Sequence, residues 1–405
     1  MKHNKLKIIS DPVYGFIKVP YDILFDVMEH PYFQRLRRIS QTGLLHLVFP
    51  GATHSRFQHA LGAMHLMFVT LESLKHKGVK ISSQEEEAAL LAILMHDLGH
   101  GPFSHALENK LVKGCHHEKL SLIFIEKLNE FFEGKLSTAL EMFMGKYHRK
   151  FFNQLISSQL DLDRLDYLKR DSFYSGVSEG NINTMRIISM FNVSHDELVV
   201  DAKGIYSIES FLSARMFMYW QVYYHKTAIL GEHLLVSIIQ RAQFLAKKGE
   251  PLDAGKNLAY FLCGENFDVF EKETLEVFTR LDDTDILQAV KTWQTHPDFI
   301  LSYLCRSVIE RKFSKTEMAS TPFSREIIEE KIALTNQLFC TEEGGFLVGE
   351  VFRKFIPYHK DRDPIFLLTK EGERVCIDHS SQQVLAGSIG SCTEKYILIY
   401  PREIS

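Results

Sequence analysis

The stretch Leu91–His105 constrains the fold of this chain more than any other part of the sequence. It begins as an apolar run, reaches His96-Asp97, and then carries a Gly-Pro pair flanked by His100 and His105. Upstream, Ser83-Gln-Glu-Glu86 is typical of a capping box, so we expect a buried helix that runs into the first histidine and stops or bends at Gly-Pro. Burying this many polar groups without a ligand is costly, and the cluster therefore indicates a metal site.

Composition is that of an ordinary globular protein, and 405 residues suffice for two or three domains. The net charge of −4 disfavours a nucleic-acid partner or a nuclease, because such binding depends on Lys and Arg at phosphates, but it permits a small anionic substrate. No signal peptide or long apolar run is present, so we expect no membrane contact. The cysteines lack C-x-x-C spacing and predict free thiols in a cytoplasmic protein: Cys115, Cys263, Cys305, Cys340, Cys376 and Cys392.

Hydrophobic periodicity predicts a mainly α protein with a small C-terminal α/β or β appendage. We expect a core over residues 1–245, a helical extension over 246–344 and a strand-rich subdomain over 345–405. Within the core, the patterns predict a hairpin (6–20), helices (21–41, 57–75, 83–96, 117–150 and 151–172), a strand pair (198–200 with 204–206) and one very long helix (207–247).

Two further segments offer metal ligands to the central stretch. His59 falls on the first turn of a predicted helix, and Asp163 falls on another. With His96 and Asp97 they make two imidazoles and two carboxylates, a set that suits Mn, Fe, Zn, Ni or Co without choosing among them. Four protein ligands also leave coordination positions for water and a substrate oxygen.

These residues carry a family resemblance. His59, His96-Asp97 and Asp163 resemble the H…HD…D signature of the HD phosphohydrolase superfamily. The surrounding blocks, residues 49–62, 96–105 and 161–171, resemble its branch of bacterial dNTP triphosphohydrolases and the vertebrate SAM-and-HD-domain dNTPase. The resemblance covers roughly residues 10–245. It implies an HD-domain helical core and hydrolysis of a dNTP to deoxynucleoside and triphosphate, with one divalent transition metal and Mg²⁺ as an optional second ion.

Helical spacing gathers two rows of side chains that suit a triphosphate and a sugar. The rows are Asp163, Tyr167 and Asp171 on one helix and Arg215, Tyr219, Tyr223 and Lys226 on another. By spacing alone, the second row is explained equally well as amphipathic decoration. The resemblance implies substrate contacts: Arg56 at the α-phosphate, Gln41, Tyr167 and Asp171 at the deoxyribose, Tyr223 at the sugar edge against a 2′-hydroxyl, and Arg164, Arg215 and Lys226 at the outer phosphates.

The resemblance also implies catalytic groups. His105, with Glu108 one turn on, matches a His–carboxylate pair that acts as general acid, in which Glu108 would raise the pKa of His105. His100 and His117 are expected to contact the phosphates. Water activated by the metal would attack the α-phosphorus, and His105 would protonate the leaving 5′-oxygen.

Regulation and alternative functions stay open at this stage. Gln34 and Arg37 match part of an allosteric nucleotide site in the metazoan enzyme, whereas Glu29 and Asp201 depart from it. A (d)GTP activator and a homo-oligomer, dimer or tetramer, are therefore hypotheses. The alternatives are an HD-family nucleotidase or phosphodiesterase acting on another phosphate ester, or a catalytically silent nucleotide-sensing protein. Retention of a His–carboxylate pair that a metal does not need favours catalysis.

Overall fold

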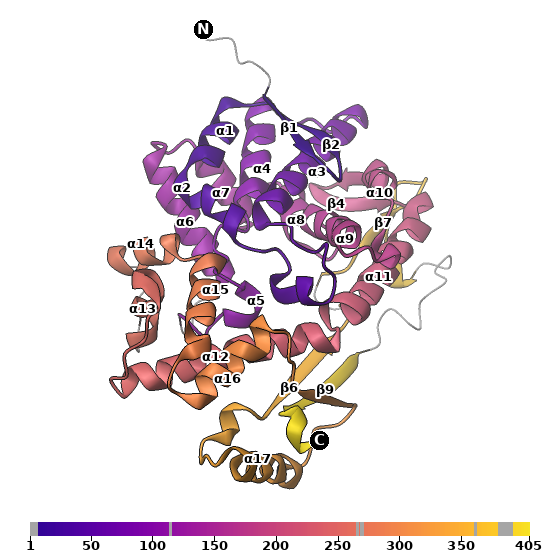
Figure 1. The fold of residues 1–405 in the computed structure, drawn as a ribbon. Coiled ribbons are helices and arrows are strands. Elements are labelled where there is room, and N and C mark those ends of the chain that lie inside the picture. Colours follow the sequence, from indigo (N-terminus) through magenta and orange to yellow (C-terminus); the bar gives the residue numbers. More distant parts are fainter. Residues whose placement is uncertain (1–6, 113–115, 265–266, 268–270, 360–362, 380–391) are drawn as a thin grey trace.

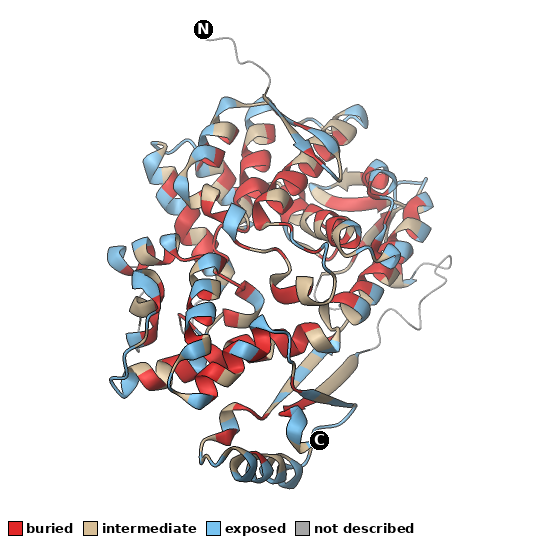
Figure 2. Ribbon diagram, viewed as in Figure 1, coloured by how far each residue is buried: buried red, intermediate tan, exposed pale blue. Residues whose placement is uncertain are grey.

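The chain folds mainly into helices around one large apolar core (Figures 1 and 2). The computed structural model describes residues 7–112, 116–264, 267, 271–359, 363–379 and 392–405. The predicted helical core with a small sheet appendage is confirmed. The five described cysteines are free thiols, as expected, and Cys115 lies outside the described residues. None of the helices in the described ranges has the length and apolar character needed to cross a bilayer.

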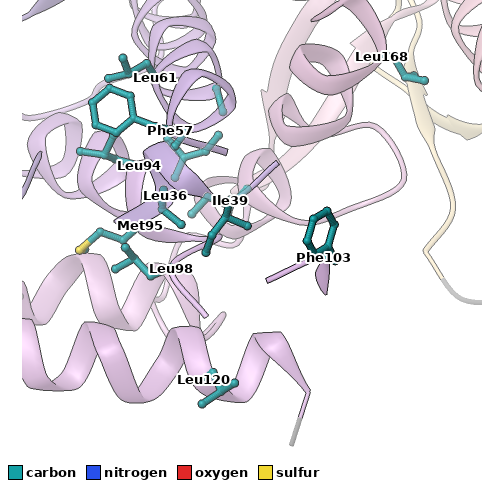
Figure 3. Packing of buried hydrophobic residues seen from close by; sticks show 14 of the residues in the cluster. Leu36, Ile39, Phe57, Leu61, Leu94, Met95, Leu98, Phe103, Leu120 and Leu168 are labelled. Carbon is teal, nitrogen blue, oxygen red and sulfur yellow. The ribbon is translucent and has the colours of Figure 1, made fainter. Parts of the chain in front are cut away.

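Three helices build the centre of the molecule: α3 (Arg56–His76), α4 (Ser83–Met95) and α9 (Leu162–Ser175). Both α4 and α9 pack against α3. Phe57 and Leu61 of α3 lie beside Leu94 of α4 in the close-up of Figure 3. The predicted helix from residue 83 is confirmed, although its capping box is formed one residue earlier, by Ser82 and Glu85.

The N-terminal segment covers one end of these helices. Strands β1 (Lys7–Asp11) and β2 (Gly15–Val19) form the predicted antiparallel hairpin. The single helix predicted over 21–41 is wrong: it divides into α1 (Asp22–Glu29), α2 (Pro31–Gln34) and a 3₁₀ turn at Arg35–Arg38. A further 3₁₀ turn follows at Gly43–Leu47. Pro31 causes the division, because it has no N–H to continue α1 and begins α2 instead.

The middle of the chain alternates short helices with one strand pair. The helices are α5 (Ser104–Leu107), α6 (His117–Phe131), α7 (Ser137–Phe143), α8 (Phe151–Ile156) and α10 (Thr184–Met190). The helix predicted over 151–172 is therefore two helices. The predicted pairing of 198–200 with 204–206 is also wrong: β4 (Glu197–Asp201) pairs with β3 (Phe191–Ser194), through a turn in which His195 and Asp196 both have positive φ.

The long helix predicted over 207–247 is interrupted. It consists of α11 (Ile205–Met218), a π-helical turn at Tyr219–Tyr223 and α12 (Lys226–Lys247). His225 is extended between them, and its ring accepts a hydrogen bond from Thr227 N at 3.2 Å, which begins α12 afresh. Because of this break, Lys226 does not continue the helical face of Arg215 and Tyr223, and that part of the spacing prediction is wrong.

The C-terminal part of the chain combines helices with strands that join two different sheets. Its helices are α13 (Gly255–Cys263), α14 (Lys272–Arg280), α15 (Asp283–Thr292), α16 (Phe299–Ile309) and α17 (Arg325–Phe339). Strands β5 (Lys315–Ala319), β9 (Thr393–Tyr400) and β6 (Gly349–Phe355) form one antiparallel sheet in that order. Strands β7 (Phe366–Leu368) and β8 (Arg374–Cys376) extend the β3–β4 pair, with β7 parallel to β4. The three-part domain division stays a prediction.

Candidate metal centre and active site

Three helical segments bring His59, His96 and Asp163 together. His59 lies on the first turns of α3, His96 at the C-terminal end of α4 and Asp163 on the first turn of α9. Oδ1 of Asp163 lies 3.1 Å from Nε2 of His59 and 3.5 Å from Nε2 of His96. Both Nε2 atoms are buried and make no hydrogen bond within the described residues. Two imidazole nitrogens and a carboxylate aimed at one point are a donor set that fits a divalent transition metal.

Asp97 borders this cluster with both oxygens already engaged. Its Oδ1 is 3.3 Å from Nε2 of His96, and its Oδ2 is 3.8 Å from Nε2 of His59. Arg56 Nη1 donates to Oδ2 at 2.6 Å, and Nε2 of His100 lies 3.2 Å from Oδ1. Burial raises the pKa of Asp97, but the charges of His96, His100 and Arg56 outweigh this and hold it well below its usual range. Asp97 is thus a charged carboxylate at the edge of the site, whereas the ligand atoms that all lie within 4.8 Å of one another belong to His59, His96 and Asp163.

A buried chain of ion pairs orients His59. Its Nδ1 hydrogen-bonds Asp166 Oδ2 at 2.7 Å. Arg170 donates to both oxygens of Asp166, at 2.9 and 3.1 Å, and to Asp11 of β1 at 2.8 Å. A side chain on Gly62 would put its Cβ 2.0 Å from Asp166 Oδ1. Because residue 62 is glycine, the Asp166–Arg170 ion pair can lie close to the backbone of α3. Such partners fix the tautomer and direction of a ligating imidazole.

Sequence reasoning missed these supporting residues. Asp166 and Arg170 are four residues apart within the segment 161–171, and this spacing could have indicated that they form an ion pair on one helix face. Asp11 belongs to a distant hairpin and offered none. Burial lowers the pKa of His59, but the carboxylates of Asp163 and Asp166 beside its two ring nitrogens outweigh it and raise that pKa to about 10. The two buried carboxylates therefore favour a positive charge at the His59 ring, and a metal bound to Nε2 would supply that charge.

The glycine turn after α4 is held from two sides. Gly99 N donates to Ser121 Oγ at 2.9 Å, and a Cβ on Gly99 would lie 2.1 Å from the His117 carbonyl oxygen. Buried Arg35 donates to the carbonyl oxygens of Leu98 and His100, at 3.1 and 2.7 Å. The backbone that carries His96, Asp97 and His100 is therefore rigidly placed.

The predicted catalytic histidines gather beside the metal cluster, but with a different pairing. His100 stacks on His117, with ring centroids 4.0 Å apart, and His105 Nε2 lies 3.4 Å from Arg56 Nη2. Glu108 does not pair with His105: it accepts from Nδ1 and backbone N of His117, at 2.7 and 2.8 Å. The reason is local, since α5 ends at residue 107 and Glu108 turns away in an extended conformation.

The charge of Glu108 raises the pKa of His105, as expected, but larger contributions of opposite sign outweigh it. Burial, followed by the charges of Arg56 and His117, lowers the pKa of His105 to about 4. Its imidazole is therefore neutral at neutral pH when no anion lies beside it. A bound phosphate would add negative charge near Arg56 and favour the protonated ring.

The residues expected around the sugar form a connected group. Asp171 is buried between His54, whose Nε2 lies 2.7 Å from Oδ1, and Tyr223, whose hydroxyl donates to Oδ2 at 2.5 Å. Tyr167 lies next to Tyr223, with ring centroids 6.3 Å apart. Sequence reasoning missed His54, although it stands in the quoted block 49–62.

A small cavity lies on the other side of Arg56. Gln41, Arg56 and His105 line it together, with Thr42 from the loop and Glu232 from α12. The amide oxygen of Gln41 is buried and has no hydrogen-bond partner among the described residues. This oxygen is available to a ligand.

The three cations expected at the outer phosphates differ in their distance from the site and in their hydrogen bonds. Arg164 pairs with Asp161, and Arg215 donates to the Pro357 carbonyl oxygen at 2.9 Å, while both Nε atoms lack hydrogen bonds within the described residues. Lys226 is exposed at the start of α12. Arg164 and Arg215 thus keep unused donors near the site, whereas Lys226 lies beyond the helix break.

The two residues expected at an allosteric site bind each other. Arg37 Nε donates to Gln34 Oε1 at 2.9 Å, and the Arg37 guanidinium stacks over Phe57 at 3.5 Å from the ring centroid. Gln34 also donates to the Met28 carbonyl oxygen at 2.7 Å. Exposed Arg37 is therefore held at the surface above α3.

Comparison with known proteins identifies the class. The HD domain family matches residues 56–171, and the HD-associated region matches residues 182–250. The chain belongs to the HD-domain phosphohydrolase family, whose members are metal-dependent hydrolases. The first match spans all the residues of the metal cluster, and the second spans α11 and α12.

Individual relatives extend this result over the whole chain. The uncharacterized protein YwfO of Bacillus subtilis is 32% identical over 100% of this chain and 94% of its own length. A solved structure titled a phosphohydrolase, from Bacteroides thetaiotaomicron, is 43% identical with a TM-score of 0.94 and covers 98% of this chain and 100% of its own. The deoxynucleoside triphosphate triphosphohydrolase SAMHD1 homolog of Dictyostelium discoideum is 31% identical to this chain. The matched region covers 62% of this chain and 52% of the length of that relative.

Proposed function

We propose that this protein is a metal-dependent dNTP triphosphohydrolase that releases deoxynucleoside and inorganic triphosphate. The observation that carries the proposal is the position of Arg56. Its guanidinium joins Asp97 of the metal cluster to His105, and it borders the cavity that contains Gln41. The metal site, a guanidinium that can bind phosphate and the imidazole of His105 therefore lie next to one another.

The metal would be held by His59, His96, Asp163 and Asp97. When bound, it would polarise a phosphoryl oxygen and lower the pKa of a water molecule. Manganese, iron, zinc, nickel and cobalt all suit these ligands, and Mg²⁺ is the optional second ion.

The chain's own side chains account for the remaining steps. Arg56 would keep one η-nitrogen on Asp97 and give the other to an α-phosphate oxygen. The added negative charge would raise the pKa of adjacent His105, which would donate a proton to the leaving 5′-oxygen. His100 and His117 would line the phosphate path, where Glu108 orients His117 by its hydrogen bond.

The Asp171 group would bind the sugar. His54 and Tyr223 hold the carboxylate in one orientation, and a 3′-hydroxyl would donate to it. Tyr167 and Tyr223 would cover the sugar edge and leave no room for a 2′-hydroxyl. The unpaired amide oxygen of Gln41 would complete this contact, with Arg164 and Arg215 at the outer phosphates and Lys226 at a more distant position. The SAMHD1 relatives, named as deoxynucleoside triphosphate triphosphohydrolases, support this substrate class.

Product analysis tests the proposal. Purified protein with Mn²⁺ and each dNTP should release triphosphate, and Asp163→Asn should abolish the reaction. Release of pyrophosphate or orthophosphate as the first product would instead support a nucleotidase or phosphodiesterase. Strong thermal stabilisation by nucleotides without turnover over many hours would support the nucleotide sensor.

Activation by (d)GTP and assembly into a dimer or tetramer stay predictions. Gln34 and Arg37 support them only as a surface pair that a guanine nucleotide could engage. Sedimentation of the protein with and without GTP, together with Arg37→Ala, tests both. Identical sedimentation and turnover in all samples would reject them.

A further inference from the structure

The helical segment after residue 250 reaches into the loops that carry the active site. Helix α15 begins at Asp283. Asp283 is only 6% exposed. Its Oδ1 accepts from Phe103 N at 2.9 Å, and its Oδ2 accepts from Ser40 N at 2.8 Å. One carboxylate thus joins the residue before Gln41 to the turn two residues before His105.

We infer that Asp283 is a positioning residue for the reaction, which fixes His105 and Gln41 relative to Arg56 by holding these two backbones together. The inference rests on the proposed function and deepens it. Asp283 lies outside residues 56–171 and 182–250, which match the HD domain and its associated region. The segment after residue 250 would then be part of the active site's framework.

The turn before His105 needs an external support. Phe103 has φ of +43°, in the left-handed region that residues with a Cβ disfavour. The helix that follows, α5, has only four residues, too few to hold a conformation by its own hydrogen bonds. The direction of the His105 side chain therefore depends on what holds Phe103 in place, and Asp283 accepts the hydrogen bond of its N–H.

The other hydrogen bond of Asp283 leads to Arg56. Ser40 pairs with Ser55 in an isolated bridge, and Arg56 N donates to the Ile39 carbonyl oxygen at 2.9 Å. A shift of Ser40 would therefore be passed to the start of α3. Since Arg56 and His105 lie 3.4 Å apart, Asp283 holds both members of this pair through their backbones.

The start of α15 is itself fixed. Asp282 and Asp285 form a capping box at this helix, and Arg38 pairs with Asp282 at 2.5 Å. Arg35, which holds the glycine turn, also donates to the Leu281 carbonyl oxygen at 3.3 Å. The carboxylate of Asp283 is thus presented from a rigid helix end.

Asp283→Asn isolates this role, because an amide offers one acceptor and sets its NH₂ against the second backbone N–H. Asp285→Asn is the matched control: it lies on the same helix turn, its amide oxygen still accepts from Asp282 N and so keeps the cap, and the other hydrogen-bond partner of Asp285 within the described residues is Asn257. Both variants are assayed as full chains with Mn²⁺ on a dNTP and on its analogue with sulfur in place of the bridging 5′-oxygen. A thiolate leaves without a proton donor, so the analogue reports the reaction independently of His105.

We expect Asp283→Asn to lower kcat on the dNTP roughly 10- to 100-fold, with a much smaller loss on the sulfur analogue and with metal content and Tm like those of Asp285→Asn. His105→Gln should show the same split. Equal losses on both substrates, or a loss matched by Asp285→Asn, would overturn the inference. If Asp283→Asn does not fold, Asp283→Ser, which keeps one acceptor, takes its place.

A second readout separates this inference from the proposed function. If the wild-type protein hydrolyses no dNTP, the proposed function fails, and histidine-ring NMR of the Mg²⁺-loaded full chain decides the positioning role. The His105 ring signals, assigned with His105→Gln, should shift in Asp283→Asn and not in Asp285→Asn. Unchanged His105 signals would overturn the positioning role.

Discussion

Asp166→Asn is the sharpest test of how the metal site is built. Asp166 touches no metal in our account, yet its carboxylate is fully buried and accepts three hydrogen bonds, one from His59 and two from Arg170. Asparagine keeps the shape and one acceptor oxygen but removes the charge. The substitution therefore leaves the metal ligands in place, weakens what orients and polarises His59, and removes one carboxylate partner from Arg170.

The expected magnitude follows from these contacts. Loss of a carboxylate behind a ligating histidine costs about 10- to 100-fold in metal affinity, or about 1.4 to 2.7 kcal/mol. The metal-free protein should also lose about 3 kcal/mol of unfolding free energy, because Arg170 stays buried with Asp11 as its remaining carboxylate partner.

The assay is calorimetric titration of metal-free protein with Mn²⁺, beside chemical denaturation. The matched control is Asp298→Asn, which breaks another ion pair, between Asp298 and Arg241, away from the metal cluster. The control should lower stability without changing Mn²⁺ affinity. Wild-type Mn²⁺ affinity in Asp166→Asn would refute the orienting role, and an equal affinity loss in the control would show that the effect is only loss of stability.

Three further predictions concern packing, pH and the sugar site. Gly62→Ala should lower the unfolding free energy by about 1 to 3 kcal/mol and reduce bound Mn²⁺ in metal analysis, because its Cβ would lie 2.0 Å from Asp166 Oδ1; unchanged values would show that the pair can move. Burial, with the charge of Arg353, lowers the pKa of His233 from 6.5 to about 4. Between these two pH values His233 is protonated in the unfolded chain but neutral in the folded chain. The free energy of unfolding is therefore undiminished by this group above pH 6.5 and decreases as the pH falls towards 4. Denaturation at several pH values should show a shallower decline in His233→Gln, and identical curves would reject the assignment. Tyr223→Phe should lower kcat/KM for a dNTP about tenfold, the worth of one hydrogen bond to a charged group, and unaltered kinetics would remove Asp171 from the sugar site.

The metal cluster could be foreseen because its residues lie in long, ordered blocks. The break after His96-Asp97 was visible from the capping signal upstream and the Gly-Pro pair downstream, and α4 begins and ends close to where these signals put it. Asp163 could be placed on a helix face by its spacing from Tyr167 and Asp171. Such predictions are reliable because helix caps and helix faces depend only on residues that are close together in the sequence.

The pairing of side chains across distant segments could not be foreseen. Glu108 stands three residues after His105 and looked like its partner, but α5 stops at residue 107 and the carboxylate turns to His117. The helix over 207–247 is apolar enough to suggest continuity, yet the π-helical turn and extended His225 interrupt it. Asp283 is 180 residues from Phe103 in the sequence, and no periodicity links them.

We expect one cation to lie among His59, His96, Asp97 and Asp163, against the α-phosphate of a nucleotide. Anomalous diffraction at the manganese edge tests this expectation, from crystals grown with Mn²⁺ and a dNTP analogue that carries a methylene group in place of the bridging 5′-oxygen. This analogue lacks the bond that the proposed reaction breaks. We expect one strong peak within bonding distance of Asp163 and of the Nε2 atoms of His59 and His96, with the α-phosphate at Arg56. A peak at other side chains, or a nucleotide bound away from Arg56, would contradict it.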